Sequence, residues 1–171
     1  GNMHVWDCSS LVCVAELQGH SRAVFFIAFS PDGRLLASAS YETVLLWPAD
    51  DWRAPPTVLS GHAYYVYGVS FSCDGRLLAS ASYDKTVRLW HILDRGAAAA
   101  TAAAAAAGPA LEVDQPLFCV AFSPVDSRLL ACGGDDGFLV LARVGADNGA
   151  IVVKRTLQGH TKTVRSLAFS P

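Results

Sequence analysis

The chain has 171 residues, of which 52% are hydrophobic and 16% charged, and its formal net charge is −2. This apolar content is enough for a buried core, while no apolar run approaches the roughly 20 residues that a membrane-spanning helix needs. Lys and Arg are dispersed along the chain, so there is no basic stripe of the kind that neutralises nucleic-acid phosphates. The first residues lack the basic leader and apolar core of a secretory signal.

Five cysteines are present, which is an odd number, and no two of them form a CxxC pair: Cys8, Cys13, Cys73, Cys119 and Cys132. We interpret them as small hydrophobic residues in a reducing compartment rather than as disulfide or zinc ligands. The sequence therefore predicts an intracellular protein, cytoplasmic or nuclear, with no metal site and no cofactor.

Short apolar runs separated by turn residues predict strands along the whole chain. The expected strands are Met3–Trp6, Val12–Leu17, Val24–Phe29, Leu35–Ala39, Val44–Trp47, Thr57–Ser60, Tyr65–Phe71, Arg76–Ser82, Thr86–Trp90, Leu111–Val113, Ile151–Leu157 and Val164–Phe169. Asp-Gly pairs at positions 32–33 and 74–75 indicate hairpin turns, because glycine tolerates the positive φ of a tight turn.

Two apolar doublets show that both faces of these strands must be buried. Leu77-Leu78 and Leu89-Trp90 each place one large side chain on either face of a strand. A small sheet that is apolar on both faces has to stack against similar sheets, which favours a repeat architecture.

An alanine-rich tract, AAAATAAAAAAGP at residues 97–109, interrupts this pattern. Alanine is the best helix former, but the tract has no amphipathic stripe, and an isolated helix of this length is marginal in water. We expect a disordered or transiently helical loop, with a docking helix as the alternative.

The strands recur with a period of about forty residues. Gly19-His20 returns at Gly61-His62, Trp47 returns at Trp90, and the segment FSPDGRLLASAS at residues 29–40 matches FSCDGRLLASAS at residues 71–82. A third, degenerate copy lies at residues 115–158, and a fourth opens at Gly159. This pattern resembles the WD-repeat β-propeller family over about three and a half repeats.

The resemblance implies an all-β fold made of four-stranded antiparallel blades in an incomplete or open ring. The expected units are residues 1–18 as the end of a preceding blade, 19–60 and 61–114 as blades, 115–158 as a degenerate blade, and 159–171 as the start of another. We expect the chain to be an excerpt of a longer propeller; a four-bladed miniature or two chains completing one ring are the alternatives.

The resemblance also implies a structural hydrogen-bond network within a blade. Its members would be His62, Asp84 and Trp90 with Ser80 or Ser82, and in the first copy His20 and Trp47. A buried indole N–H needs an acceptor, and a histidine placed between Ser and Asp satisfies both. The set resembles a hydrolase triad, but a link to a buried Trp favours a structural role, and no catalytic residue is predicted.

The resemblance further implies that partners bind the face that carries the Gly-His loops. Carried over position by position, the predicted contact residues are Phe25, Tyr41, Tyr65, Tyr67, Tyr83, Phe118, Asp135 and Arg165. Clustered aromatics with an Arg are typical of interaction hot spots. In the alternative interpretation Phe25 and Phe118 pack between blades and only the tyrosines are exposed.

The preferred hypothesis is thus a non-catalytic scaffold that binds a protein or peptide partner on this face, with no membrane or nucleic-acid partner and with possible self-association through open blade edges. The alternatives are a propeller-type enzyme, which would need polar residues converging on a central channel, and an RNA-associated WD-repeat subunit, which would need a basic band.

Overall fold

A computed structural model describes residues 1–92, 107–146 and 149–170. Within these ranges the chain forms thirteen strands, one short 3-10 helix and no α-helix, which confirms the all-β class; no helix there could cross a membrane. The elements are β1 (Asn2–Asp7), β2 (Val12–Gln18), β3 (Phe26–Phe29), β4 (Leu35–Ala39), β5 (Tyr41–Pro48), β6 (Thr57–Phe71), β7 (Leu77–Ser82), β8 (Thr86–His91), β9 (Ala107–Glu112), β10 (Leu117–Phe122), β11 (Leu129–Gly134), η1 (Asp135–Gly137), β12 (Leu139–Val144) and β13 (Ile151–Leu157).

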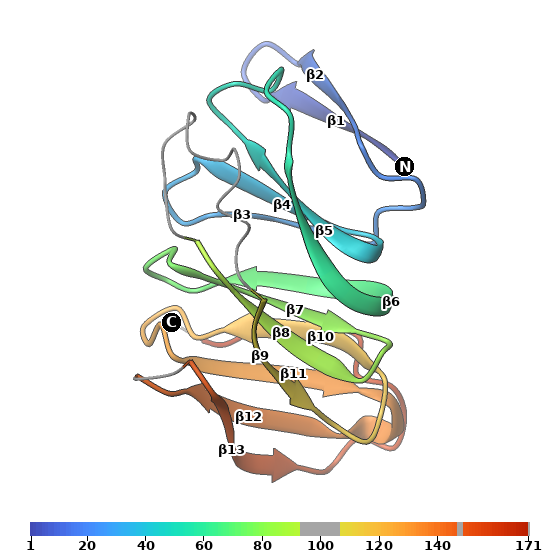
Figure 1. The fold of residues 1–171 in the computed structure, drawn as a ribbon, viewed down its shortest axis with the longest axis vertical. Coiled ribbons are helices and arrows are strands. Elements are labelled where there is room, and N and C mark those ends of the chain that lie inside the picture. Colours follow the sequence, from blue (N-terminus) through green and yellow to red (C-terminus); the bar gives the residue numbers. More distant parts are fainter. Residues whose placement is uncertain (93–106, 147–148, 171) are drawn as a thin grey trace.

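Antiparallel pairing groups the strands into four units that follow one another along the long axis of the molecule (Figure 1). The N-terminal hairpin is β1–β2, and the first sheet is β3, β4, β5 and the first part of β6. The second sheet is the remainder of β6 with β7, β8 and β9, and the third is β10–β13. This is the expected arrangement of an open propeller.

Strand β6 belongs to both the first and the second sheet, whereas two separate strands were expected there. Its first four residues pair with β5, and its last six pair with β7. The residues between stay extended because Tyr65 pairs with Tyr41 and the Val66 N–H donates to the Ser40 carbonyl oxygen at 2.9 Å. The strand order is therefore continuous over seven strands, and the expected unit boundary between residues 60 and 61 lies inside β6.

The buried side chains form clusters at the junctions between units, because strands such as β7 and β8 bury side chains on both faces. Leu78 and Trp90 pack in the cluster that joins the first and second sheets. Leu89, next to Trp90, packs with Leu117 in the cluster that joins the second and third sheets. The prediction that both faces of the second sheet are buried is confirmed. A further cluster joins the hairpin to the first sheet: Leu17, Leu36, Leu45 and Trp47.

Two expected elements differ from the structure. The predicted strand Val164–Phe169 is not a strand; Val164 N–H donates to the Gly134 carbonyl oxygen at 2.9 Å, but no described strand forms a ladder with this segment. The last residues of the alanine-rich tract, 107–109, belong to β9 instead of a loop, and Ala107 pairs with Trp90. The remainder of the tract lies outside the described residues.

Replacing Leu78 by Ala should lower the free energy of unfolding by about 2–5 kcal/mol, because the site is fully buried and cannot collapse around the lost side chain. Urea denaturation measures the change. Val125→Ala is the matched control: Val125 is 80% exposed, and its change should stay below about 0.5 kcal/mol. Equal losses for the two variants would show that the junction cluster does not carry stability.

Candidate functional site

The second sheet contains a buried chain of four hydrogen-bonded side chains. The Trp90 indole N–H donates to the Ser80 hydroxyl at 2.8 Å, and Ser80 Oγ lies 2.7 Å from His62 Nε2. His62 Nδ1 in turn lies 2.8 Å from Asp84 Oδ2. β7 supplies the serine and β8 the tryptophan, while His62 lies within β6 and Asp84 in the β7–β8 turn. Three strands and a turn therefore hold the set together.

The proton positions follow from this geometry. Because the indole can only donate, the Ser80 hydroxyl accepts from it and donates onward to His62 Nε2, which leaves Nδ1–H to donate to Asp84. Burial alone would raise the pKa of Asp84, but hydrogen bonds from His62, Thr86 and the Ala63 N–H hold that pKa well below its usual range. Asp84 is thus a carboxylate with its acceptors occupied.

The set has the connectivity of a hydrolase triad but not its accessibility. Ser80 has 0% exposed surface, and its oxygen is already occupied by Trp90 and His62. A nucleophilic serine has to reach a substrate carbonyl beside an oxyanion pocket. The geometry instead suits a clamp that fixes the Asp84 turn against the strand beneath it.

The first sheet repeats only part of this network. His20 Nε2 lies 2.7 Å from Ser38 Oγ, which accepts from the Trp47 indole at 2.9 Å. His20 Nδ1, however, is buried without a hydrogen-bond partner. Burial lowers the pKa of His20 to about 4.

The missing partner follows from the shorter turn of the first sheet. Glu42 has a φ of +61°, which matches the +71° of Lys85 in the second sheet and not the backbone of Asp84. Glu42 therefore takes the place of Lys85, and its side chain is exposed. The position that Asp84 occupies is the one that the shorter turn lacks.

The third sheet replaces the polar set with apolar residues. Ala142 pairs with Leu130 as Trp90 pairs with Leu78, so alanine stands at the tryptophan position. Cys132 follows Leu130 by two residues, as Ser80 follows Leu78. Burial raises the pKa of Cys132 to about 12, so its thiol stays protonated and behaves as a small hydrophobic residue.

Ser82, the other serine proposed for the network, bonds elsewhere. Its hydroxyl donates to the Tyr65 carbonyl oxygen at 2.9 Å and accepts from the Asp84 N–H at 3.1 Å. Tyr83 N–H also donates to the Tyr65 carbonyl oxygen, at 2.9 Å. Ser82 therefore ties the clamped turn to the strand that carries the exposed tyrosines.

Seven aromatic rings form one connected cluster, the aromatic face, on the side of the Gly-His loops. Tyr65 contacts Tyr41 at a centroid distance of 4.9 Å, Phe25 at 5.4 Å and Tyr64 at 4.8 Å. Tyr67 stacks on Phe118 at 5.0 Å and thereby links the second sheet to the third. The members of the aromatic face are Phe25, Tyr41, Tyr64, Tyr65, Tyr67, Tyr83 and Phe118.

The rings stay partly open to solvent. Tyr64 is 42%, Tyr83 41% and Phe25 41% exposed. The other four rings, including Phe118, are half-buried against their neighbours. Phe25 is thus as exposed as the tyrosines and is not enclosed between sheets.

Two arginines border the aromatic face. The Arg22 guanidinium lies 5.8 Å from the Tyr41 ring centroid, and that of Arg165 lies 5.3 Å from Phe118. Asp135, also predicted at this face, accepts a 2.6 Å hydrogen bond from Thr163 and thereby holds the C-terminal segment. Sequence reasoning missed Tyr64 and Arg22, although an aromatic residue directly beside Tyr65 in the Gly-His loop was an available signal.

Other reactive groups form no site in the described part of the chain. No cluster of three or more metal-ligating side chains occurs there. Burial raises the pKa of Cys119 to about 11, so its thiol is not poised as a nucleophile. His4 and His91 are exposed.

Comparison with known families gives four matches to one family model, described as WD domain, G-beta repeat, at residues 11–48, 53–91, 112–141 and 151–171. Each complete match begins near the outer strand of one unit and continues into the next. The first match covers β2 to β5, for example, whereas the hydrogen-bonded sheet is β3 to β6. Each sequence repeat therefore connects two neighbouring sheets.

Two proteins of Arabidopsis thaliana are locally similar: "Cell division cycle 20.6, cofactor of APC complex" and "Cell division cycle 20.5, cofactor of APC complex". Each is 50% identical over 44 residues, which is 25% of this chain and 10% of the relative. The match thus covers about a tenth of the length of these relatives.

Replacing Asp84 by Ala should lower the free energy of unfolding by about 1–3 kcal/mol, because His62 Nδ1–H and the Ala63 N–H would lose their acceptor. Thermal denaturation measures the change. Glu42→Ala in the corresponding turn of the first sheet is the control and should have little effect, since that side chain is exposed. An unchanged melting temperature for Asp84→Ala would contradict the clamp.

The buried His20 should make stability pH-dependent. Its folded pKa is about 4, below the 6.5 of an unperturbed histidine, so the unfolded chain binds the extra proton between these values. The contribution of neutral His20 to the free energy of unfolding is fully present above pH 6.5 and is lost as the pH falls towards 4. His20→Gln should flatten the slope of unfolding free energy against pH between 6.5 and 5; an unaltered slope would contradict the assignment.

Proposed function

Because this chain belongs to the WD domain, G-beta repeat family, we propose that it is a non-catalytic scaffold that binds a protein or peptide partner on the aromatic face. Repeats of this family generally serve as protein-interaction scaffolds and are typically not enzymes. The proposal assigns contact to Phe25, Tyr41, Tyr65, Tyr67 and Tyr83, together with Phe118, Arg165 and the adjoining Tyr64 and Arg22.

The observation that carries the proposal is the continuity of the seven rings across three sheets. Large aromatic side chains lose little conformational entropy on binding and supply much apolar contact area, which is why they dominate interface hot spots. Here each ring has a neighbouring ring at a centroid distance of 4.8–5.7 Å, so most of the ordering is present before a partner arrives.

The buried hydrogen-bond network of the second sheet also supports a partner-binding role for the aromatic face. Asp84 and Ser82 fix the turn that presents Tyr83, and Ser82 also holds the Tyr65 carbonyl group. A binding surface whose backbone is fixed in this way loses less freedom on association. We therefore assign the network a positioning role for the partner-binding face.

The alternative functions have less support. A hydrolytic role would use Ser80, whose hydroxyl is fully buried and bonded to Trp90. An RNA-binding role would need a basic band, whereas the cation–π contacts to the rings in the described residues come from Arg22 and Arg165, and the chain is slightly acidic.

The local relatives support a role as an adaptor protein. Two plant proteins that share one repeat-sized segment are described as cofactors of the APC complex. A role as an adaptor in a larger intracellular assembly, cytoplasmic or nuclear, agrees with this likeness. Self-association through open edges stays a prediction; exposed apolar side chains on β2 and β3, such as Val14 and Ile27, are the surface it would use.

Tyr64→Ser combined with Tyr83→Ser should lower partner capture about tenfold, because both rings are exposed and their loss removes contact area without unfolding the protein. Quantitative affinity purification compares the amount of partner captured by the variant with the amount captured by the unsubstituted protein. The control is Val125→Ser with Val152→Ser, two exposed residues away from the rings, which should capture the same proteins as the parent. Equal capture by the tyrosine variant would contradict the aromatic face.

A further inference from the structure

A second row of similar side chains lies at the opposite ends of the strands. Each sheet has a turn between its first and second strand in which an Asp carboxylate accepts from the backbone N–H of the Arg two residues later. The three arginines, with these Asp Oδ1 to Arg N distances, are Arg34 at 3.2 Å, Arg76 at 3.0 Å and Arg128 at 3.0 Å. Since these turns alternate with the Gly-His loops along antiparallel strands, the arginines lie on the face opposite the aromatic face.

The backbones of the second and third arginines are held by the sheets. Ile92 N–H donates to the Arg76 carbonyl oxygen at 2.9 Å, and Val144 N–H donates to that of Arg128 at 2.8 Å. Both arginines are exposed residues. The sheets therefore fix their backbones, while the side chains reach solvent.

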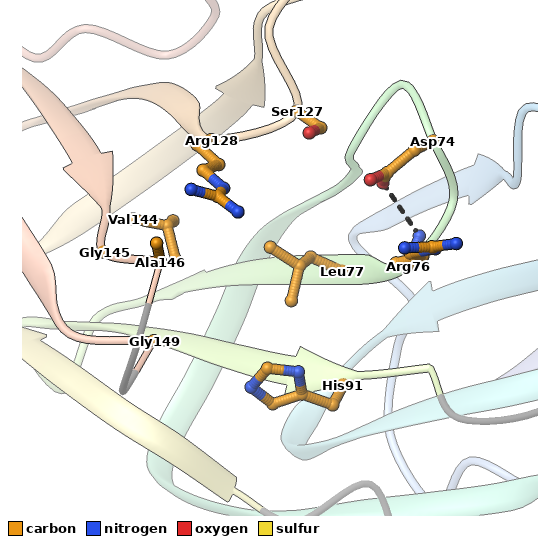
Figure 2. A pocket seen from close by; sticks show the side chains of 10 residues that line it. All are labelled: Asp74, Arg76, Leu77, His91, Ser127, Arg128, Val144, Gly145, Ala146 and Gly149. Carbon is orange, nitrogen blue, oxygen red and sulfur yellow. Dashed lines mark hydrogen bonds between the residues drawn. The ribbon is translucent and has the colours of Figure 1, made fainter.

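A cavity of about 450 Å³ opens between these two turns. Figure 2 shows Arg128, Ser127, Asp74, Arg76 and His91 arranged around Leu77. Two arginines face one carboxylate in the lining, and Asp74 already accepts from the Ser72 hydroxyl at 2.6 Å and from Arg76 N–H. Asp126, in the neighbouring turn, is paired with Arg143 at 2.9 Å. Among the described lining residues, two arginines thus stand against the one carboxylate of Asp74.

We propose that this cavity binds a phosphoryl group carried on a peptide side chain, with Arg76 and Arg128 as the anion-binding residues and His91 as an additional donor. A guanidinium presents paired N–H donors that match two phosphoryl oxygens, and two guanidinium charges balance a dianion. The described junction between the first and second sheets lacks one of these donors. Between the first and second sheets the residue that pairs with Leu35, as His91 pairs with Leu77, is Pro48, which has no donor.

The lining favours a peptide over a nucleotide as the carrier. Apart from the polar residues above, the described lining consists of Leu77, Val144, Gly145, Ala146 and Gly149, and it includes no Phe, Tyr or Trp on which a base could stack. Small residues and exposed backbone next to a charged pair suit an extended peptide that places one modified side chain in the cavity.

The test is a titration followed by the backbone amide NMR signals of the full chain. The probes are a Gly-Gly-phosphoserine-Gly-Gly peptide, the same peptide with serine, inorganic phosphate and adenosine monophosphate. The phosphopeptide should shift the amides of Arg76, Arg128 and His91 saturably and bind about tenfold more tightly than the serine peptide. Arg76→Gln with Arg128→Gln should weaken binding about tenfold, and Arg76→Lys with Arg128→Lys should weaken it less, because charge is kept while the paired donors are lost.

Arg34→Gln is the matched control, since Arg34 has the same turn but does not line the cavity, and it should leave binding unchanged. Tighter binding of inorganic phosphate or adenosine monophosphate than of the phosphopeptide would overturn the choice of ligand. Equal weakening by Arg34→Gln, or shifts that do not saturate, would overturn the site. Tyr64→Ser with Tyr83→Ser should not alter this titration, so failure here is separable from failure of the aromatic face.

Discussion

The first and second sheets of this protein bury apolar side chains on both faces, and the remainder of the structure depends on that constraint. Adjacent residues of one strand, such as Leu89 and Trp90, enter different core clusters on opposite sides of the sheet. A four-stranded sheet of this kind would leave one apolar face in water unless another sheet covered it. The sheets therefore stack, and the continuous β6 joins the first two covalently and by hydrogen bonds.

Because the sheets stack, equivalent turns of successive sheets lie side by side. Short repeats produce extended surfaces in this way. On the side of the Gly-His loops, rings from three sheets come together. On the opposite side, the Asp-x-Arg turns bring arginines to the junction between two sheets. The buried network of His62 and Asp84 holds one of these turns in place. In the third sheet, Cys132 and Ala142 pack in an apolar cluster at the corresponding positions, where no polar group needs a partner.

The sequence was sufficient to predict most of the strands and their stacking, because period, turn residues and apolar doublets are local signals, whereas the side on which the aromatics gather followed from the family resemblance. It did not predict that β6 would be continuous, since this depends on Tyr41 from another strand pairing with Tyr65. Nor did it predict that Glu42 would adopt the conformation of Lys85, because a one-residue deletion can be placed at either position of the turn. The cavity at Arg128 was equally hidden, since its lining comes from two sheets.

The most direct test of the central claim is amide hydrogen exchange in the third sheet after the junction beside it has been weakened. Leu89→Ala removes a fully buried side chain from the cluster that the second and third sheets share. The account predicts that amides of β10–β12 lose protection together with those of β7 and β8, although no residue of the third sheet is changed. If β10–β12 kept their protection while β7 and β8 lost theirs, the sheets would be independent units and stacking would not be what holds them folded.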